Sequence, residues 1–458
     1  MAFGDRPDEG NEGELRDLKG TQSFLPEEQI GREYVIDTLK KHFKLYSYRP
    51  VETSILEFYD IAASKYGGGA EILKETYRLK DQGGRELCLR YELTFKLAKL
   101  IGMNPNVRMP FKRYEIGKVF RDGPVSTGRL REFTQCDVDV VGTQSAIADA
   151  ELMALAFSVF RDLGIEVYME VNSRNLMFGI FKSAGMHESK YIDAALSIDK
   201  LLKIGEDGVR REMLGKGFSS DAIEKVFEIM KSASMRTSNL QMAEYIEESA
   251  PNDLTKKGVQ ELKDLFSFAK SMGIKGDIRL TPTLARGLGY YTGIMYEVYS
   301  AKGAMKSTLA AGGRWDNLIK EFVGSKRDYP ATGISFGLDA IFSVLLEGGG
   351  IGKKGEQPRV PMLLVIPIGT MDESLKLLQQ ARDLDISADL LPEKSLSKAM
   401  EYANKEAIPY ALILGKEELS NDMVKLRDMH TGKETEISLK AIRSTFEAMK
   451  EYGKFSYK

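Results

Sequence analysis

The chain is poor in the residues that build metal sites and covalent-catalysis sites. Its 458 residues include only two cysteines, Cys88 and Cys136, and only three histidines. The cysteines have no metal-ligand spacing, so we expect two buried small side chains and no zinc site. So few cysteines favour a reducing compartment, the cytoplasm. No Ser/His/Asp or Cys/His grouping predicts covalent catalysis.

Long hydrophobic runs are also absent. No segment of the sequence approaches the roughly 20 apolar residues that span a bilayer, so we expect no membrane segment. The first 20 residues are acidic and glycine-rich, without a basic start or an apolar core, and they are not expected to be a signal peptide. A length of 458 residues predicts two or three domains.

Neither sign of charge is in excess, because the net charge is only −2. A nucleic-acid partner would therefore need local basic patches. One stretch is a candidate for such a patch and consists of Arg108, Lys112, Arg113, Lys118, Arg121, Arg129 and Arg131. An ordinary charged surface between two strands is an equally good interpretation of it.

Hydrophobic spacing divides the chain into three regions. Two strands, 113–120 and 131–141, are predicted to form a long hairpin, and residues 146–163 a helix. Residues 183–272 are dominated by charged helical segments and are typical of a helical insertion. After a Gly- and Pro-containing linker, residues 361–458 alternate strands and helices, which predicts an independent α/β domain around a mixed sheet.

Polar residues alternate along the second strand of the predicted hairpin. Gln135, Asp137 and Asp139 would share one face with Phe133, since alternate residues of a strand point the same way. Such a face could hold a ligand carrying an amine or an imidazole. A face paired with solvent or with neighbouring Arg and Lys side chains is the alternative.

Arg286 stands between the small residues Ala285 and Gly287, which would let a ligand approach closely. Its guanidinium offers a fork of donors suited to phosphate or carboxylate. The tract has no P-loop pattern, so a phosphate cradle of that kind is not predicted.

Three tracts, LRYELT (89–94), REFTQCDVDVVG (131–142) and LARGLGYYTG (284–293), resemble the histidyl-tRNA synthetase family of class II aminoacyl-tRNA synthetases. The resemblance covers nearly the whole chain, and AAGGRWDNL is similar to a second family motif, with Trp315 where Tyr is usual. The form LRYELT is closer to archaeal and eukaryotic members than to bacterial ones.

The resemblance implies a role for each matching residue. Arg121 and Arg286 would be catalytic and would contact the α-phosphate of ATP. Phe133 would stack on adenine. The remaining matches would bind histidine, with Glu92, Thr94 and Gln135 holding the α-amino group and Asp139 and Tyr291 reading the imidazole.

The resemblance also implies a fold and an activity. It predicts an α+β catalytic domain with an antiparallel sheet flanked by helices (1–182 and 273–347), the helical insertion (183–272), a linker (348–360) and a C-terminal α/β anticodon-binding domain (361–458). The activity would be an ATP-dependent histidine–tRNA ligase, acting on L-histidine and tRNA(His) with ATP and Mg²⁺. It would be a cytoplasmic homodimer, with no metal bound by the protein itself.

Some positions depart from the family pattern. Asp339 and Ala340 stand where motif 3 usually has Glu and Arg, which removes a cation from the nucleotide site. Ser54 replaces the usual motif 1 proline, Gly289 replaces an Asp, and the motif 2 loop is short.

Two other functions fit part of the sequence. A catalytically silent paralogue could use the histidine pocket as a sensor, for example as a regulatory subunit of histidine biosynthesis, and Ala340 favours this. Arg121, Arg286 and the anticodon-type domain disfavour it. An RNA-binding accessory protein without a small-molecule site is disfavoured by the complete set of histidine-reading residues.

Overall fold

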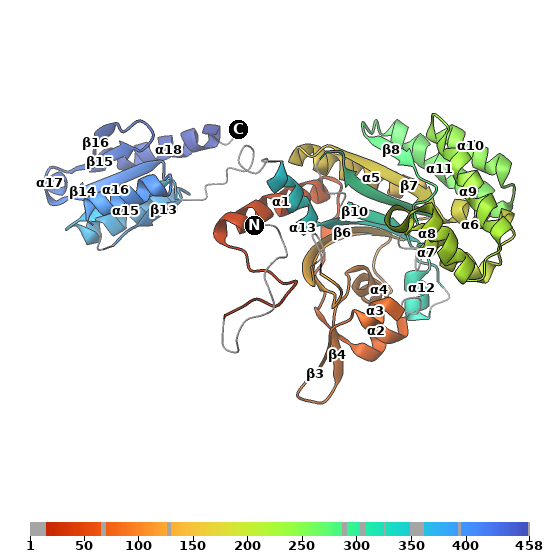
Figure 1. Ribbon diagram of the computed structural model, residues 1–458. Helices are drawn as coiled ribbons and strands as arrows, with labels where there is room; N and C mark the ends of the chain where they lie inside the picture. The colour runs from red at the N-terminus through yellow and green to blue at the C-terminus, as the bar shows by residue number, and fades with distance from the viewer. Residues whose placement is uncertain are drawn as a thin grey trace. The chain divides into compact units, whose positions relative to one another are not determined.

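The computed structural model describes residues 15–65, 70–125, 130–285, 291–302, 308–324, 327–348, 361–392 and 395–456. The chain forms two compact units, one built around residues 31–350 and the other around residues 351–458. Each unit has its own sheet (Figure 1). No helix in the described ranges is both long enough and apolar enough to cross a membrane.

The larger unit is built on an eight-stranded sheet of order β1-β5-β6-β11-β10-β9-β7-β8. The six neighbouring strands β5, β6, β11, β10, β9 and β7 pair antiparallel. Only the outer pairs β1–β5 and β7–β8 are parallel. The predicted hairpin is confirmed as β5 and β6. The strands are β1 (Arg49–Pro50), β5 (Phe111–Phe120), β6 (Glu132–Val141), β7 (Val167–Ser173), β8 (Asp277–Leu280), β9 (Ile294–Ser300), β10 (Thr308–Arg314) and β11 (Ala331–Gly337).

One face of this sheet packs against three helices, α1 (Pro26–Leu45), α5 (Ala146–Leu163) and α13 (Leu338–Glu347). Phe336 of β11 lies 5.8 Å from the ring of Phe43 in α1 and 5.9 Å from that of Phe160 in α5. All three rings are fully buried. The predicted antiparallel sheet flanked by helices is therefore confirmed.

Smaller elements pack beside β5 and β6. Phe95 of α4 meets Phe322 of α12 edge to face, with ring centroids 4.7 Å apart. The elements are a three-stranded sheet of β2 (Leu56–Phe58), β4 (Glu86–Leu89) and β3 (Arg78–Lys80), with α2 (Tyr59–Lys65), α3 (Ala70–Lys74), α4 (Thr94–Met103) and α12 (Leu318–Val323).

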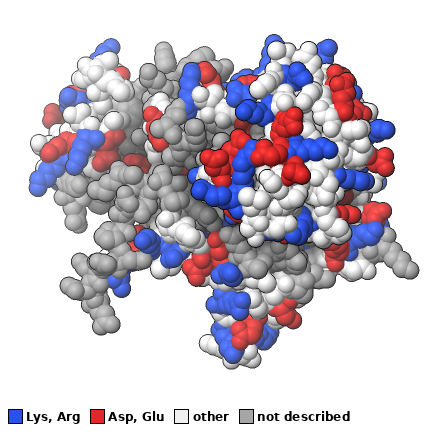
Figure 2. Space-filling view, turned by 45° about the vertical axis from the view of Figure 1, so that its right-hand side comes forward, with Lys and Arg blue, Asp and Glu red and all other residues white. Residues whose placement is uncertain are grey.

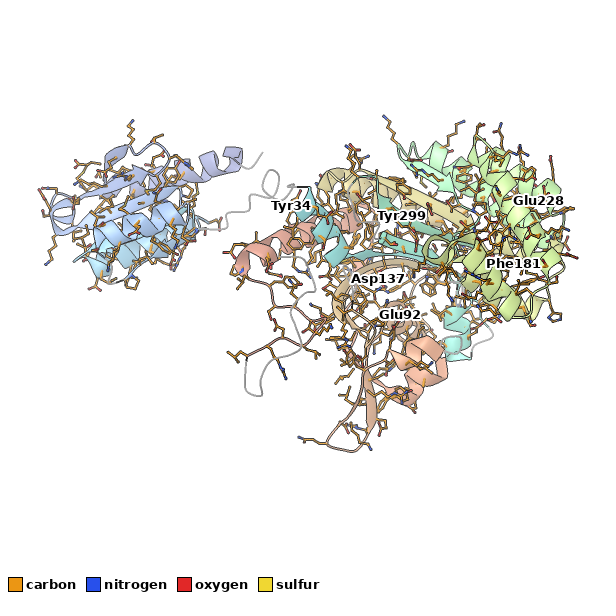
Figure 3. All side chains as sticks on the ribbon, in the orientation of Figure 1. Tyr34, Glu92, Asp137, Phe181, Glu228 and Tyr299 are labelled. Carbon is orange, nitrogen blue, oxygen red and sulfur yellow. The ribbon has the colours of Figure 1, made fainter. Side chains whose placement is uncertain are left out.

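Residues 174–271 form a helical region beside β7, drawn in green in Figure 1. Glycines let α6 and α11 approach closely, because a Cβ at Gly258 would lie 2.3 Å from the backbone nitrogen of Leu176. Figure 3 shows Phe181 inside this region and Glu228 on its outer surface. The helices are α6 (Arg174–Ser183), η1 (Glu188–Lys190), α7 (Tyr191–Ile198), α8 (Leu201–Gly215), α9 (Ser220–Ser234), α10 (Asn239–Ser249) and α11 (Asp253–Ser271).

The smaller unit is the predicted α/β domain with a mixed sheet of order β13-β12-β14-β15-β16. The buried strands β12 and β14 pair in parallel, and β15–β16 is the predicted C-terminal hairpin. Its elements are β12 (Leu363–Ile368), α15 (Met371–Asp383), β13 (Ala388–Leu390), α16 (Leu396–Lys405), β14 (Tyr410–Gly415), α17 (Lys416–Ser420), β15 (Met423–Asp428), β16 (Glu434–Ser438), η2 (Leu439–Ala441) and α18 (Ile442–Ser456).

The candidate basic stretch around β5 and β6 does not form a continuous positive surface in its described part. Lys112 pairs with Glu151, Lys118 with Glu132 and Arg131 with Asp122, while Arg113 is fully buried. Lys/Arg and Asp/Glu side chains are interspersed on the face drawn in Figure 2. The interpretation as a charged surface between strands fits these pairs better.

Candidate active site

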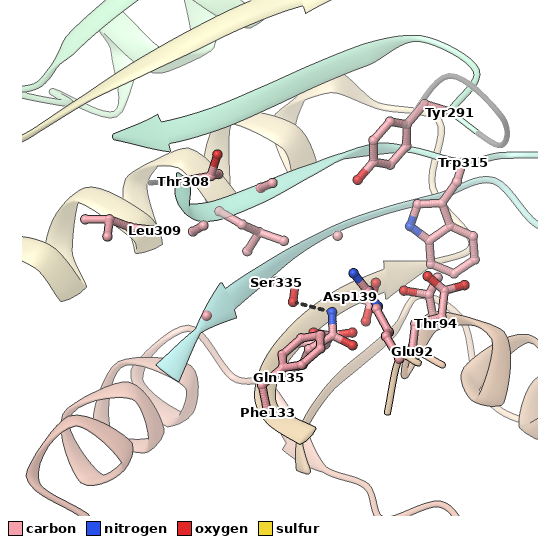
Figure 4. Close-up of a pocket in the computed structure, with 17 residues that line it drawn as sticks. Glu92, Thr94, Phe133, Gln135, Asp139, Tyr291, Thr308, Leu309, Trp315 and Ser335 are labelled. Carbon is pink, nitrogen blue, oxygen red and sulfur yellow. Dashed lines mark hydrogen bonds between the residues drawn. The ribbon is translucent and has the colours of Figure 1, made fainter. Parts of the chain in front are cut away.

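A pocket of about 300 Å³ opens on the sheet face away from α1, α5 and α13 (Figure 4). Strands β6, β10 and β11 form its floor, and Trp315 follows β10 at its edge. Seven of the eight predicted site residues line it together: Glu92, Thr94, Arg121, Phe133, Gln135, Asp139 and Tyr291. The eighth, Arg286, lies outside the described residues.

Strand β6 supplies the polar floor through its alternation. Phe133, Gln135, Asp137 and Asp139 line the pocket, as the strand period predicted. The residues between them, such as Cys136, are buried on the opposite side. The strand period predicts Asp137 on this face as well, but the resemblance to the family gives it no role.

A glycine in β11 makes room for Asp139. Gly333 lies opposite Asp139 in the β6–β11 register. A Cβ at Gly333 would lie 2.0 Å from Asp139 Oδ1, a distance that no side chain tolerates. Any larger residue at this position would therefore displace the Asp139 carboxylate from the pocket.

The floor rests on a buried ion network. Arg113 has no exposed side-chain surface, and its Nη2 lies 2.8 Å from Asp139 Oδ2. Arg113 also faces Glu115 at 3.5 Å, and Glu115 pairs with Arg90 at 3.1 Å. Since a buried charge is costly unless paired, Arg113 fixes where the Asp139 carboxylate lies.

Burial raises the pKa values of the pocket carboxyls. It raises the pKa of Glu92 from 4.5 to about 7, with Arg121 opposing the shift and Asp137 adding to it. The pKa values of Asp137 and Asp139 are also raised by burial, and Arg113 opposes both shifts. Three carboxyls close to one another in a cavity favour a cationic ligand.

Several acceptors at the pocket floor have no hydrogen-bond donor among the described residues. They are Gln135 Oε1, Asp137 Oδ1 and Asp139 Oδ2. Of these, Asp139 Oδ2 forms an ion pair with Arg113, but the geometry of that contact is not that of a hydrogen bond. Unsatisfied buried acceptors are rare in folded proteins unless a ligand completes them. An ammonium group supplies three donors and a neutral imidazole supplies one, so both suit this floor.

Arg121 supplies a cation to the same pocket, where its charge opposes the rise that burial causes in the pKa values of Glu92 and Asp137. Its guanidinium carbon is 4.3 Å from the ring centre of Tyr91 and 5.0 Å from that of Phe133. Its Nε donates to the carbonyl oxygen of Tyr91 at 3.4 Å. Two aromatic rings thus hold one cation beside three carboxyls, and a ligand with both an amine and an anionic group would match this polarity.

The sequence matches two family models. A model described as histidyl-tRNA synthetase covers residues 20–341, and one described as an anticodon binding domain covers residues 363–449. This chain belongs to the histidyl-tRNA synthetase family. The pocket lies within the first match, and the smaller unit holds the second.

Curated relatives match almost end to end. Histidine–tRNA ligase 1 of Bacillus cereus (strain ATCC 10987 / NRS 248) is 43% identical over 94% of this chain and 97% of its own length. Histidine–tRNA ligase of Gloeobacter violaceus is 34% identical over 93% of this chain and 97% of its own length. Both relatives are bacterial, so they add no support to the archaeal and eukaryotic likeness of LRYELT.

Solved structures agree with the fold. The histidyl-tRNA synthetase from Nostoc sp. PCC 7120 has a TM-score of 0.80 at 26% identity, covering 96% of this chain and 99% of the other. An ATP phosphoribosyltransferase regulatory subunit/histidyl-tRNA synthetase from Bacillus halodurans has a TM-score of 0.70 at 20% identity, covering 85% and 96%, and shows the fold alone.

Asp339, where we expect a departure from the family's motif 3, has two partners in the structure. Its Oδ1 pairs with Arg32 Nη1 at 2.6 Å, and its Oδ2 accepts from the backbone N–H of Thr134 at 3.0 Å. Asp339 therefore ties α13 to both α1 and β6. Arg32 does not line the pocket, so it is not placed to supply the cation that the departure at Ala340 is expected to remove.

The motif 1 departure at Ser54 also has a structural partner. Ser54 Oγ accepts from Lys96 Nζ at 3.0 Å, and Lys96 pairs with buried Glu57 at 2.8 Å. A proline at this position could not make this contact. The predicted departure at Gly289 lies outside the described residues, as does part of the motif 2 loop.

Proposed function

We propose that this protein is a histidine–tRNA ligase that activates L-histidine with ATP to histidyl-adenylate and transfers it to tRNA(His). One observation carries the proposal. Gln135 Oε1 and Asp137 Oδ1, which have no hydrogen-bond donor among the described residues, belong to side chains that line the same pocket as Asp139 and the aromatic-held cation Arg121. Histidine has an amine and an imidazole for the acceptors and a carboxylate for the cation.

The proposed roles follow this polarity. Glu92, Thr94 and Gln135 hold the α-amino group of histidine, and Asp139 and Tyr291 read its imidazole. A site built to hydrogen-bond the imidazole rejects analogues that lack its nitrogen atoms, because its own buried groups would then stay unpaired.

Phe133 stacks on adenine, and Arg121 and Arg286 contact the α-phosphate. The histidine carboxylate is already a nucleophile, so no general base is needed for it to attack the phosphorus and release pyrophosphate. Negative charge grows on the phosphate oxygens, and preplaced guanidinium groups stabilise it. Mg²⁺ enters bound to the ATP phosphates, as is usual for this cation.

The decisive experiment is histidine-dependent exchange of labelled pyrophosphate into ATP, with the purified chain, Mg²⁺ and no tRNA. Exchange with histidine and not with other amino acids supports the activation step. Charging of tRNA(His) then tests the transfer step. No exchange, with histidine still bound in calorimetry, would favour the sensor, and tRNA binding without histidine binding would favour the RNA-binding accessory protein.

Three further features belong to the proposal. The domain boundaries are those predicted, with a catalytic domain of 1–182 and 273–347, an insertion of 183–272, a linker of 348–360 and an anticodon-reading domain of 361–458. The enzyme is a cytoplasmic homodimer. Exposed Ile55, Leu56 and Phe58 around β2 support a dimer interface there.

Restoring the motif 3 arginine, as Ala340→Arg, is expected to tighten ATP binding about tenfold, since a guanidinium on adenine contributes roughly 1–2 kcal/mol. Ala340 lies close enough to the pocket for an arginine there to reach it. A Cβ added at Gly337, which lines the pocket, would lie 3.7 Å from the Cβ of Ala340. The KM for ATP in pyrophosphate exchange measures the effect, with Ala340→Gln as the uncharged control. Equal or weaker ATP binding in the arginine variant would mean that another group closes the adenine site.

The raised pKa of Glu92 predicts a pH effect on the ligand-free protein. Between pH 4.5 and about 7 the folded state keeps a proton that the unfolded state loses, so this group's contribution to stability falls as pH rises. The glutamine of Glu92→Gln does not titrate. The melting temperature of this variant minus that of wild type should therefore increase from pH 5 to pH 8. Histidine should stabilise the wild type more at pH 8, where Glu92 is ionised. Parallel melting curves for the two proteins would contradict this.

A further inference from the structure

Both ends of the segment that carries Tyr291 are held by one short stretch at the β7–α6 junction. Asn172 Nδ2 donates to the carbonyl oxygens of Pro282 at 3.1 Å and Leu284 at 2.9 Å. On the far side, Arg174 Nη1 donates to the carbonyl oxygen of Tyr291. Asn172 near the end of β7 and Arg174 at the start of α6 therefore hold the chain at residues 282–284 and at residue 291.

The first grip uses the whole amide of Asn172. Its Nδ2 donates to the carbonyl oxygens of Pro282 and Leu284, and its Oδ1 accepts from the backbone N–H of Ser173 at 2.8 Å. The side chain has no exposed surface. An aspartate or leucine of similar size would leave two buried carbonyls without donors, which is costly.

The second grip is a set of contacts on three successive carbonyls. Beside the Arg174–Tyr291 contact, Asn175 Nδ2 reaches the Thr292 carbonyl at 3.4 Å, and the backbone N–H of Arg174 donates to Gly293 at 2.9 Å. Arg174 also lies 4.7 Å over the ring of Phe178, which limits its motion.

Helix α11 anchors the junction from behind. Glu261 accepts from Ser173 Oγ and from Asn175 Nδ2, both at 2.7 Å. Burial raises the pKa of Glu261, while these two donors and Lys257 lower it. Asn172 and Arg174 with their carbonyl partners, called the clamp below, are thus attached to the helical region and not only to the sheet.

We propose that Arg174 is a positioning residue for histidine recognition, acting through the backbone of Tyr291, and that Asn172 supports it by holding the chain at residues 282–284. The inference rests on the proposed function, in which Tyr291 reads the imidazole. The Tyr291 ring lines the pocket, and its direction is set by the backbone that Arg174 grips at the same residue. Sub-ångström placement matters for such a contact.

Arg174→Met tests the clamp, because Arg174 is only partly buried and its loss should leave the fold intact. We expect the Kd for L-histidine, measured by calorimetry without ATP, to rise about tenfold, because a Tyr291 side chain that is no longer held in place loses its hydrogen bond to the ligand. The Kd for ATP should change less than twofold. Arg174→Lys keeps one charged donor and should recover part of the affinity.

The matched control is Arg236→Met. Arg236 also lies over an aromatic ring, 4.2 Å from the centre of Tyr245, but it has no contact with the pocket. It should leave the Kd for histidine unchanged. Asn172→Ala tests the other grip and is interpreted only if its melting temperature shows a folded protein.

A double-mutant cycle with Tyr291→Phe separates positioning from general destabilisation. If Arg174 acts through the Tyr291 hydroxyl, Arg174→Met should weaken histidine binding much less in the Tyr291→Phe background. Full additivity of the two effects would overturn the inference, as would an unchanged Kd in Arg174→Met.

The two proposals fail in different ways. A wild-type protein that binds histidine but gives no pyrophosphate exchange defeats the proposed activity, and the clamp is still tested by the Kd. A wild-type protein that binds no histidine defeats both.

Discussion

Replacing Arg121 by methionine is expected to lower histidine-dependent pyrophosphate exchange by about 10³-fold, the usual cost of removing a preplaced donor from a developing oxyanion. Methionine keeps much of the side-chain volume between Tyr91 and Phe133 but removes the charge. Histidine binding should weaken far less, because the pocket carboxyls still hold the ammonium group. The loss should therefore appear in kcat more than in the KM for histidine.

Two variants sharpen this experiment. Arg121→Lys keeps the charge but loses the planar fork that lies between two rings, so it should remain well below wild type. Arg78→Met removes a guanidinium that lies 4.0 Å from the Tyr59 ring and does not line the pocket. It should exchange pyrophosphate at the wild-type rate. A loss of less than tenfold in Arg121→Met would remove Arg121 from the catalytic set.

The hairpin residues of the site could be predicted because strand geometry is simple. Once 131–141 is a strand, Phe133, Gln135 and Asp139 must share a face, and the paired strand fixes which face is buried. Asp137 obeys the same rule, so the alternation alone placed it beside the others. The family motifs gave it no role, although its unpaired oxygen and raised pKa mark it as part of the floor.

Arg113 shows what alternation does not reveal. In the sequence it belongs to a basic stretch and suits a solvated surface. The register places Arg113 directly opposite Asp139, so a charge that looks exposed in the sequence forms an ion pair inside the sheet. Counting back from the hairpin turn could have given this register, but the length of the turn was not certain from the sequence.

The clamp at β7–α6 could not be predicted from the sequence. Asn172 and Arg174 are more than 100 residues from the carbonyls that they hold. Their partners are backbone atoms, which carry no residue-specific signal. Only the pairing of β7 with both β8 and β9 brings the two ends of the Tyr291 segment to one strand end.

Changing Asp139 to asparagine is expected to raise the KM for histidine about 100-fold, since it replaces a charged acceptor at the imidazole with a neutral amide of the same shape. The KM for ATP should change little, because Phe133 and Arg121 remain. The variant should also be less stable. Buried Arg113 loses its charged partner at 2.8 Å and keeps Glu115, 3.5 Å away, and the carbonyl oxygen of Leu93, 3.4 Å away.

Stability and recognition must be separated to interpret this variant. Glu151→Gln removes a carboxylate that accepts from Lys112 at 2.5 Å and from Tyr48 at 3.0 Å, away from the pocket. It should lower the melting temperature while leaving the KM for histidine unchanged. If Asp139→Asn lost stability with an unchanged KM, Asp139 would serve only to neutralise Arg113, and the imidazole would be read by other groups. A raised KM at a temperature where both variants are fully folded would assign the reading to Asp139, with Arg113 as the residue that holds its carboxylate in place.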